Sequence, residues 1–379
     1  MTEITLPQAL AFRLDRQHLT RPAETALTAA RTLVGAQAQV HSAAILQLRA
    51  RSAAGGGEAD IDRALYQDRN LVKLWAQRST LHLTPADDLP LVMAVRRQQV
   101  GAYHNWYAKE GLSREQVEIL VAAVVTALDQ GAHSRMDLSR RLVPTLGEWA
   151  RPMLEHSWGG IIKLACALGH VCHGPAEKED GEGAREALFV SLAQWLGQPL
   201  TVLDSGAAMA ELLRRYLAVY GPATPRDFNK FIGGYAGPAH QAFADLGDEI
   251  VPVKLAGKTA YILARDLDAV KGAAPEPGQI TVLGLFDPYL LAHSDTSQYL
   301  DDRFRPAVYR VAGWISPVIL RQGRVVATWT HRRVAGPKGK GAWEVQVSPL
   351  EKLFKKELPA ITRGLRRLSG GVPVTISGI

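Results

Sequence analysis

The chain has 379 residues and a mass of 41.2 kDa, more than one hydrophobic core usually holds, so several domains are expected. Its 47% hydrophobic and 21% charged residues are typical of a folded protein, and a formal charge of +7 permits a nucleic-acid partner without requiring one. Two cysteines are too few for a disulfide framework. Without a leader pattern or an apolar stretch near roughly 20 residues, we expect a soluble, cytoplasmic protein with no membrane segment.

Helical and strand periodicities follow one another in a fixed order near the N-terminus. Three helices are predicted first, over residues 6–15, 22–33 and 36–50. A Gly-rich loop at 55–57 and a short helix at 60–67 come next. The stretch LVKLWAQRSTLHLTP then alternates apolar and polar residues around a turn, which predicts a β-hairpin.

The same order returns twice along the chain. The second set has a helix at 114–130, then SRMDLSRRLVP and MLEHSWGGIIKLACALG, with strands HVCHG and ALFVSL around the charged loop PAEKEDGEGARE. The third has GAAMAELLRRYLAVYG, TPRDFNKFIGG and GPAHQAFADLG, with the hairpin EIVPVKLAGKTAYIL turning at Gly257. Three helices and a two-stranded wing are the order of a winged helix-turn-helix. A helix-rich enzyme with incidental hairpins is the alternative.

Strands dominate after about residue 265. QITVLGLFD, AVYRVAGWISPVILRQGRVVATWTHRR and GAWEVQVSP are predicted strands, with turns at Gly313 and Gly323 and a helix with a basic face at 349–368. We therefore predict an α+β chain with three tandem winged helix-turn-helix motifs and a C-terminal β-rich, barrel-like domain. The expected segments are 1–110, 111–200, 201–264 and 265–379.

Residues that suggest a metal or a covalent nucleophile are sparse. CALGHVCH places Cys166, His170, Cys172 and His173 across one helix-to-strand junction, whereas zinc ligands usually come as close pairs separated by a longer loop. There is no Gly-x-Ser-x-Gly elbow and no Gly-rich phosphate loop. We therefore expect neither a metal nor a cofactor.

Basic side chains gather at the predicted turns. The candidate DNA contacts are Arg78, His82, Arg303, Arg305, Arg321, Arg324, Arg332, Arg333, Lys338 and Lys340. A hairpin with a basic tip is typical of a probe for the minor groove or for phosphates. A solubilising edge loop explains the same pattern equally well.

Two glutamines, Gln37 and Gln39, stand one residue apart in GAQAQV. On a helix, residues two apart point about 200° away from each other. They share a site only where the backbone is irregular, which Gly35 makes plausible. By pattern alone, these are partly buried amides bonded to backbone.

Four stretches carry a family resemblance: the Gln37-Ala38-Gln39 element, WAQRSTLHLTP, GLFDPYLLAHSD and GWISPVILRQGRVVATW. Together they resemble the winged-helix DNA glycosylases of the AlkZ type, over essentially the whole chain. The diagnostic element of that branch is Gln, an aliphatic residue, then Gln, whereas a sister branch ends in Asp. Ala38 is the smallest aliphatic residue, a minor departure.

The resemblance implies a monofunctional DNA glycosylase that cleaves the N-glycosidic bond of N7-alkylated guanine and unhooks azinomycin-type interstrand crosslinks in repair and self-resistance. Gln37 and Gln39 would be the catalytic pair, and the partner would be double-stranded DNA bound by a monomer. Amides are very weak bases, but N7-alkylation makes the base cationic, so it leaves as a neutral group without protonation. A transcriptional regulator that binds operator DNA is the alternative, and winged helices that serve only as scaffolding are a third possibility.

Overall fold

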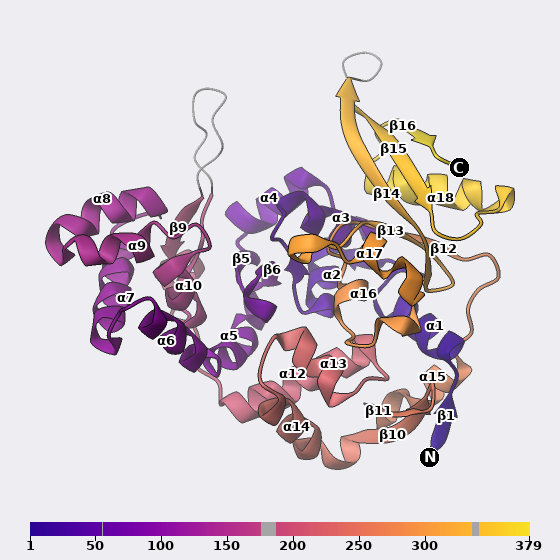
Figure 1. Cartoon of the computed structure of the whole chain (residues 1–379), viewed down its shortest axis with the longest axis horizontal. Coiled ribbons are helices and arrows are strands. Elements are labelled where there is room, and N and C mark those ends of the chain that lie inside the picture. The colour runs from indigo at the N-terminus through magenta and orange to yellow at the C-terminus, as the bar shows by residue number, and fades with distance from the viewer. Residues whose placement is uncertain (55, 176–186, 336–340) are drawn as a thin grey trace. The chain divides into compact units, whose positions relative to one another are not determined.

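Figure 1 shows the computed structural model of the chain, which describes residues 1–54, 56–175, 187–335 and 341–379. The chain divides into two compact units. The first unit comprises Met1–Ile61 and Leu213–Ile379, and the second unit comprises Asp62–Leu212. Both ends of the chain therefore build the first unit. This grouping is coarser than the four expected segments, whose boundaries stay a prediction.

The N-terminal part of the chain alternates short strands with helices. These are β1 (Thr2–Ile4), α1 (Leu6–Arg16), β2 (Ala23–Thr25), α2 (Ala26–Leu33), β3 (Ala36–Gln37), α3 (His41–Arg51), β4 (Ser52–Ala54) and α4 (Glu58–Tyr66). Thr5 begins α1 with a capping box, in which its side chain accepts from the Gln8 N–H while the Gln8 side chain bonds the Thr5 N–H. Strands β2 and β4 pair in parallel.

The second unit combines a sheet with helices. Its elements are β5 (Leu71–Trp75), β6 (Leu81–Pro85), α5 (Leu89–Arg97), α6 (Val100–Lys109), α7 (Arg114–Asp129), β7 (His133–Ser134), α8 (Arg135–Leu146), α9 (Arg151–Leu154), α10 (Gly160–Ala167), β8 (Val171–His173), β9 (Leu188–Ser191) and α11 (Leu192–Leu196). Strands β6, β5, β8, β9 and β7 lie in that order, and all neighbouring pairs are antiparallel. The hairpin predicted in LVKLWAQRSTLHLTP is confirmed as β5 and β6.

The C-terminal part of the chain starts with helices and ends with strands. Its elements are α12 (Ser205–Tyr220), α13 (Pro225–Ile232), α14 (Ala236–Asp245), β10 (Ile250–Leu255), β11 (Lys258–Leu263), α15 (Leu267–Gly272), β12 (Ile280–Leu283), α16 (Pro288–Leu291), α17 (Arg305–Val308), β13 (Val318–Arg321), β14 (Arg324–Ala335), β15 (Gly341–Pro349), α18 (Leu358–Leu368) and β16 (Val374–Ser377). The hairpin of β10 and β11 pairs with β1 at the other end of the chain.

The expected barrel-like domain is an open sheet instead. Strands β12, β13, β14, β15 and β16 follow in that order, so β12 and β16 lie at opposite edges among the described residues. Helix α18 packs against β12 (Figure 1). Ile361 and Leu365 of this helix share a buried core with Val282 and Trp329. Five strands whose apolar face is covered by a helix need no closure, because the helix already removes that face from water.

The strand predicted through AVYRVAGW is wrong. The structure has the short helix α17 there, followed by a 3-10 turn at Val311–Gly313. Ala312 and Gly313 both have positive φ, 58° and 75°, which turns the chain back so that Tyr309 and Ile315 form a bridge. The turn at Gly323 is confirmed, because Arg321 pairs with Arg324 across Gln322 and Gly323. The number of winged helix-turn-helix motifs stays a prediction. Among the described residues, no helix combines the length and apolar character needed to cross a membrane.

Candidate active site

The first five residues of the helix predicted over 36–50 are not helical. Helix α2 ends at Leu33, and Val34 and Gly35 follow with positive φ of 59° and 97°. The Gly35 N–H donates to the Ala30 carbonyl at 2.8 Å, which closes the helix end. A β-branched residue in this conformation is strained by about 1–3 kcal/mol. The next helix, α3, starts only at His41.

Gln37 and Gln39 therefore lie in non-helical backbone, where the separation of about 200° between helix positions two apart does not apply. Gln37 belongs to β3 and is 5% exposed, whereas Gln39 lies in the following bend and is exposed. Ala38 between them is fully buried. Only a small side chain fits there without displacing its neighbours, which accounts for alanine at the aliphatic position.

The backbone of Gln37 is held by the side chain of Gln47, six residues into α3. The Gln37 N–H donates to Gln47 Oε1, and Gln47 Nε2 donates to the Gln37 carbonyl, both at 3.0 Å. Gln47 is fully buried, and its Nε2 also lies 3.4 Å from the Leu285 carbonyl. Leu285 belongs to the stretch GLFDPY, so a segment distant in sequence lies against the glutamine element.

A buried ion pair joins α3 to that same stretch. Arg51 donates to both carboxylate oxygens of Asp287, at 2.7 and 2.8 Å, and both side chains are fully buried. Arg51 also reaches the Gln47 carbonyl at 3.1 Å and Gln17 Oε1 at 3.3 Å. Asp287 accepts in addition from the Tyr289 N–H at 3.0 Å. The carboxylate is therefore occupied in supporting the loop and is not placed to act as a base at the surface.

Sequence reasoning missed Gln47, Arg51 and Asp287. Arg51 and Asp287 are 236 residues apart, and no local pattern links such positions. The available signal was the motif GLFDPYLLAHSD, whose Asp stands between an apolar run and a Pro.

The predicted DNA contacts are spread over several elements, and most of those on the C-terminal part have partners. Arg303 pairs with Asp301 at 2.8 Å, and Arg332 with Glu344 at 2.5 Å. Both arginines keep about three quarters of their side-chain surface exposed, at 74% and 76%. Exposed pairs of this kind are weak and exchange readily with a phosphate.

Arg321 differs from these two because its guanidinium is enclosed. It donates to Glu357 at 2.6 Å, to Glu351 at 3.3 Å and to the Lys352 carbonyl at 2.7 Å, and its side chain is only 22% exposed. The Arg321 guanidinium holds the pKa of Glu357 below its usual range. Little of this arginine is left for DNA.

The remaining predicted contacts on the C-terminal part differ in the partners that hold their side chains. Arg305 donates to Thr296 Oγ1 at 2.6 Å, and Arg324 to the Gln298 carbonyl at 3.3 Å. Arg333 is exposed and lies 3.9 Å from Glu58. Lys338 and Lys340 lie outside the described residues.

In the second unit, Arg78 and His82 lie on one hairpin. Arg78 Nη2 is 3.3 Å from His82 Nε2, and His82 Nδ1 is 2.8 Å from the Thr80 carbonyl. These partners assign the Nδ1–H tautomer, with Nε2 as acceptor. Burial, with Arg78 nearby, lowers the pKa of His82 to about 3. His82 is therefore neutral at pH 7 and does not present a cation to phosphate.

The Cys/His stretch is part of the core of the second unit. Cys166 is buried with its Sγ 3.8 Å from the Trp75 carbonyl, and the His173 ring packs against Trp75 and Phe189 at centroid distances of 4.9 and 4.8 Å. Burial raises the pKa of the Cys166 thiol to about 11 and lowers that of His173 to about 3. Within the part of the chain that the structure describes, no three His, Cys, Asp or Glu side chains are grouped to hold a metal ion.

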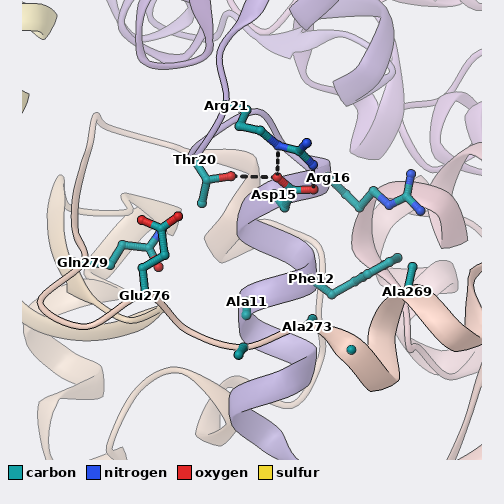
Figure 2. A pocket seen from close by; sticks show the side chains of 12 residues that line it. Ala11, Phe12, Asp15, Arg16, Thr20, Arg21, Ala269, Ala273, Glu276 and Gln279 are labelled. Carbon is teal, nitrogen blue, oxygen red and sulfur yellow. Dashed lines mark hydrogen bonds and ion pairs between the residues drawn. The ribbon is translucent and has the colours of Figure 1, made fainter.

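Figure 2 shows a pocket of about 490 Å³ in the first unit, beside α1 and the segment after α15. Asp15 accepts from Thr20 at 2.8 Å and from Arg21 at 2.6 and 2.8 Å (Figure 2). The Arg21 hydrogen bond holds the pKa of Asp15 below its usual range. The Asp15 carboxylate is held by Arg21 and Thr20 and is therefore not available as a base. Neither Gln37 nor Gln39 lines this pocket.

Comparison with known proteins supplies a family for this arrangement. A family model described as "DNA glycosylase AlkZ-like" matches residues 30–370. A Streptomyces sahachiroi protein described as "Interstrand DNA cross-link repair glycosylase" is 32% identical over 329 residues, 85% of this chain and 86% of that relative. The solved structure of Streptomyces sahachiroi DNA glycosylase AlkZ superposes with a TM-score of 0.84 at 29% identity, covering 99% of this chain and 100% of that one. The resemblance found in the sequence is confirmed, and the chain belongs to the AlkZ-like DNA glycosylase family.

Proposed function

We propose that this protein hydrolyses the N-glycosidic bond of N7-alkylguanine in double-stranded DNA and unhooks interstrand crosslinks of the azinomycin type, with Gln37 and Gln39 at the reacting centre and without a metal or cofactor. Family membership supports the reaction, and the name of the Streptomyces sahachiroi relative supports a crosslinked substrate. The observation that carries the assignment to these residues is an exposed Gln39 beside a Gln37 whose backbone is fixed.

The chemistry suits neutral amides if the leaving base is cationic. N7-alkylation already places a positive charge on guanine, so bond cleavage expels a neutral base and needs no general acid. The site then has to hold a water molecule on the far side of the sugar and to direct carbonyl dipoles at the developing positive charge. The amides of Gln37 and Gln39 can do both. A stable neutral lesion leaves as an anion unless its base is protonated, and amides supply no acid for that protonation.

The exposure of Gln39 also bears on access to the lesion. Most glycosylases turn the target nucleotide out of the duplex into a pocket. A crosslinked guanine is tethered to the opposite strand, so full extrusion is sterically hindered. An amide at the surface, rather than at the end of a deep pocket, can reach a base that is only partly displaced.

Excision of defined lesions tests this proposal. We expect alkali-labile sites where N7-methylguanine stands in a duplex, and none where uracil does. Gln37→Ala and Gln39→Ala should each lower the single-turnover rate about 10²-fold while the Kd for DNA changes little, because each removes an oriented dipole from the reacting centre. Gln241→Ala, at an exposed glutamine bonded to Asp245, is the matched control. Efficient uracil excision, or equal losses of rate and binding in the two variants, would contradict the proposal.

The absence of a covalent intermediate is a second part of the proposal. A monofunctional glycosylase leaves an abasic site and forms no Schiff base. Borohydride should therefore trap no protein–DNA adduct during the reaction. A trapped adduct would assign a lysine nucleophile instead.

We further propose that the protein acts as a cytoplasmic monomer, that its helices and hairpins form three winged helix-turn-helix motifs, and that exposed arginines such as Arg303, Arg332 and Arg333 contact DNA phosphates. A regulator without catalytic activity is not favoured, because the family is one of DNA glycosylases. Such a regulator would protect a defined sequence and leave N7-methylguanine intact. Sedimentation of the protein alone tests the monomer.

A further inference from the structure

The side chain of Gln47 is bonded to the backbone of Gln37 in the way a neighbouring β-strand would be. We propose that Gln47 is a positioning residue for the catalytic pair: its amide fixes the backbone of Gln37 and, two residues on, the direction of Gln39. This inference rests on the proposed function of Gln37 and Gln39.

The geometry of the contact is that of a hydrogen-bonded strand pair. The two atoms of the Gln47 amide engage the N–H and the carbonyl of one residue, Gln37, each at 3.0 Å. In an antiparallel sheet, opposed residues exchange two bonds of this kind. The amide therefore engages Gln37, in the two-residue strand β3, with the same two bonds that an opposed strand residue would make.

The amide has one orientation available to it. Its oxygen must face the Gln37 N–H and its nitrogen the Gln37 carbonyl, and the nitrogen also lies 3.4 Å from the Leu285 carbonyl. Gln47 is fully buried, so water does not compete for these bonds. Arg51 bonds the Gln47 carbonyl at 3.1 Å and is itself held by both oxygens of Asp287. These bonds fix the backbone from which the Gln47 side chain extends.

Placement of this kind matters for the rate of the reaction. Displacement of a reacting group by about 1 Å can cost about 10²-fold in rate. Without the amide, the Gln37 N–H and carbonyl lose these two partners within a buried segment, and the backbone between Val34 and α3 shifts to satisfy them. A shift there changes where both amides point but need not change how DNA binds.

Gln47→Glu distinguishes a role of residue 47 in hydrogen bonding to Gln37 from a role that depends only on its volume. A protonated carboxyl group has one donor and one acceptor and reproduces both bonds to Gln37, whereas a carboxylate has no donor for the Gln37 carbonyl. Burial raises the pKa of such a carboxyl group, while the Arg51 guanidinium nearby lowers it and Asp287 neutralises that guanidinium. Activity of this variant should therefore fall as pH rises, while its volume stays the same.

The experiment is single-turnover excision of N7-methylguanine with excess enzyme, from pH 6 to 9, corrected for spontaneous depurination. We expect Gln47→Leu to react about 10²-fold more slowly than the wild type, with full reaction amplitude and a DNA Kd within about twofold. Gln47→Glu should approach the wild-type rate at pH 6 and lose it toward pH 9. Gln8→Leu is the matched control, since the Gln8 amide also bonds backbone groups in the first unit but far from the pair in sequence.

Three results would overturn the inference. Gln47→Leu could keep the wild-type rate, or it could lower only the amplitude, which reports the folded fraction. Gln47→Glu could keep the wild-type rate at a pH at which NMR shows its carboxyl group to be ionised. If Gln47→Leu does not fold, the comparison of Gln47→Glu at pH 6 and 9 still decides. Failure of the proposed function has a different signature, because Gln37→Ala and Gln39→Ala would then excise N7-methylguanine at the wild-type rate.

Discussion

Arg51→Met should destabilise the first unit strongly, because it removes one half of a fully buried ion pair. Both oxygens of Asp287 accept from Arg51 at 2.7 and 2.8 Å, and neither side chain is exposed. Removing one partner of such a pair costs about 3–5 kcal/mol, since the remaining charge stays buried without compensation. The Gln47 carbonyl and Gln17 Oε1 also lose a donor, at about 1 kcal/mol each. The sum is a large part of a typical stability of about 5–15 kcal/mol.

The double variant Arg51→Met/Asp287→Leu tests whether the loss comes from the unpaired charge. Replacement of a buried pair by apolar residues of similar volume is often neutral. We expect the double variant to recover the about 3–5 kcal/mol of the unpaired charge. It should not recover the about 1 kcal/mol lost at each of Gln47 and Gln17, and it should lose about 1 kcal/mol more because the Tyr289 N–H loses Asp287 as its acceptor. A double variant that is more stable than Arg51→Met alone would identify the unpaired charge of Asp287, rather than lost packing, as the cause of the destabilisation.

Hydrogen exchange is the suitable assay, because a chain with two compact units need not unfold in one step. Amides of α3 should exchange faster in Arg51→Met by the factor that corresponds to the lost stability. Amides of α7 in the second unit serve as the internal reference. A loss below about 1 kcal/mol, or a double variant no more stable than the single one, would refute the reasoning.

Three further predictions concern the second unit and the DNA contacts. Burial lowers the pKa of His173 to about 3 in the folded protein, so this imidazole takes up a proton at lower pH there than in the unfolded chain. The contribution of neutral His173 to the free energy of unfolding is therefore fully present above about pH 6.5, and it shrinks by about 2 kcal/mol between pH 7.5 and 5. His173→Phe should remove that share of the acid sensitivity of the second unit in hydrogen exchange, and an unchanged pH profile would contradict the burial argument. Arg332→Gln should reduce the slope of log K against log salt for DNA binding by about 0.9, as for one lost phosphate contact, and an unchanged slope would remove Arg332 from the interface. Arg321→Gln should leave that slope unchanged and lower the stability of the first unit instead, because Glu357 and Glu351 then lose their cation. A reduced slope at constant stability would show that Arg321 contacts DNA.

The helices and hairpins that depend on local periodicity could be predicted from the sequence. Helix α7 was expected over 114–130 and spans Arg114–Asp129, and the hairpin with its tip between Arg321 and Arg324 forms as expected. In these segments the alternation of apolar residues and the turn residues specify the same conformation, and neighbours in sequence make the contacts.

Prediction failed where contacts between residues several positions apart override the preference of the local pattern. Residues 36–40 have a helical pattern, yet they leave the helix because Val34 and Gly35 adopt positive φ and Gln47 bonds the backbone of Gln37. The strand predicted through AVYRVAGW is replaced by α17, whereas the turn expected at Gly313 forms and is closed by the bridge between Tyr309 and Ile315.

The sequence by itself determined the alternation of helices and hairpins, the family resemblance and the glutamine pair as candidates, because these reside in short motifs. Tertiary structure decided what those residues can do. It buries Gln37 and exposes Gln39, makes His82 neutral, and encloses Arg321 between carboxylates. Burial and charge pairing depend on segments that are far apart in the chain, such as those joined by Arg51 and Asp287, 236 residues apart, and no local pattern encodes which of them will meet.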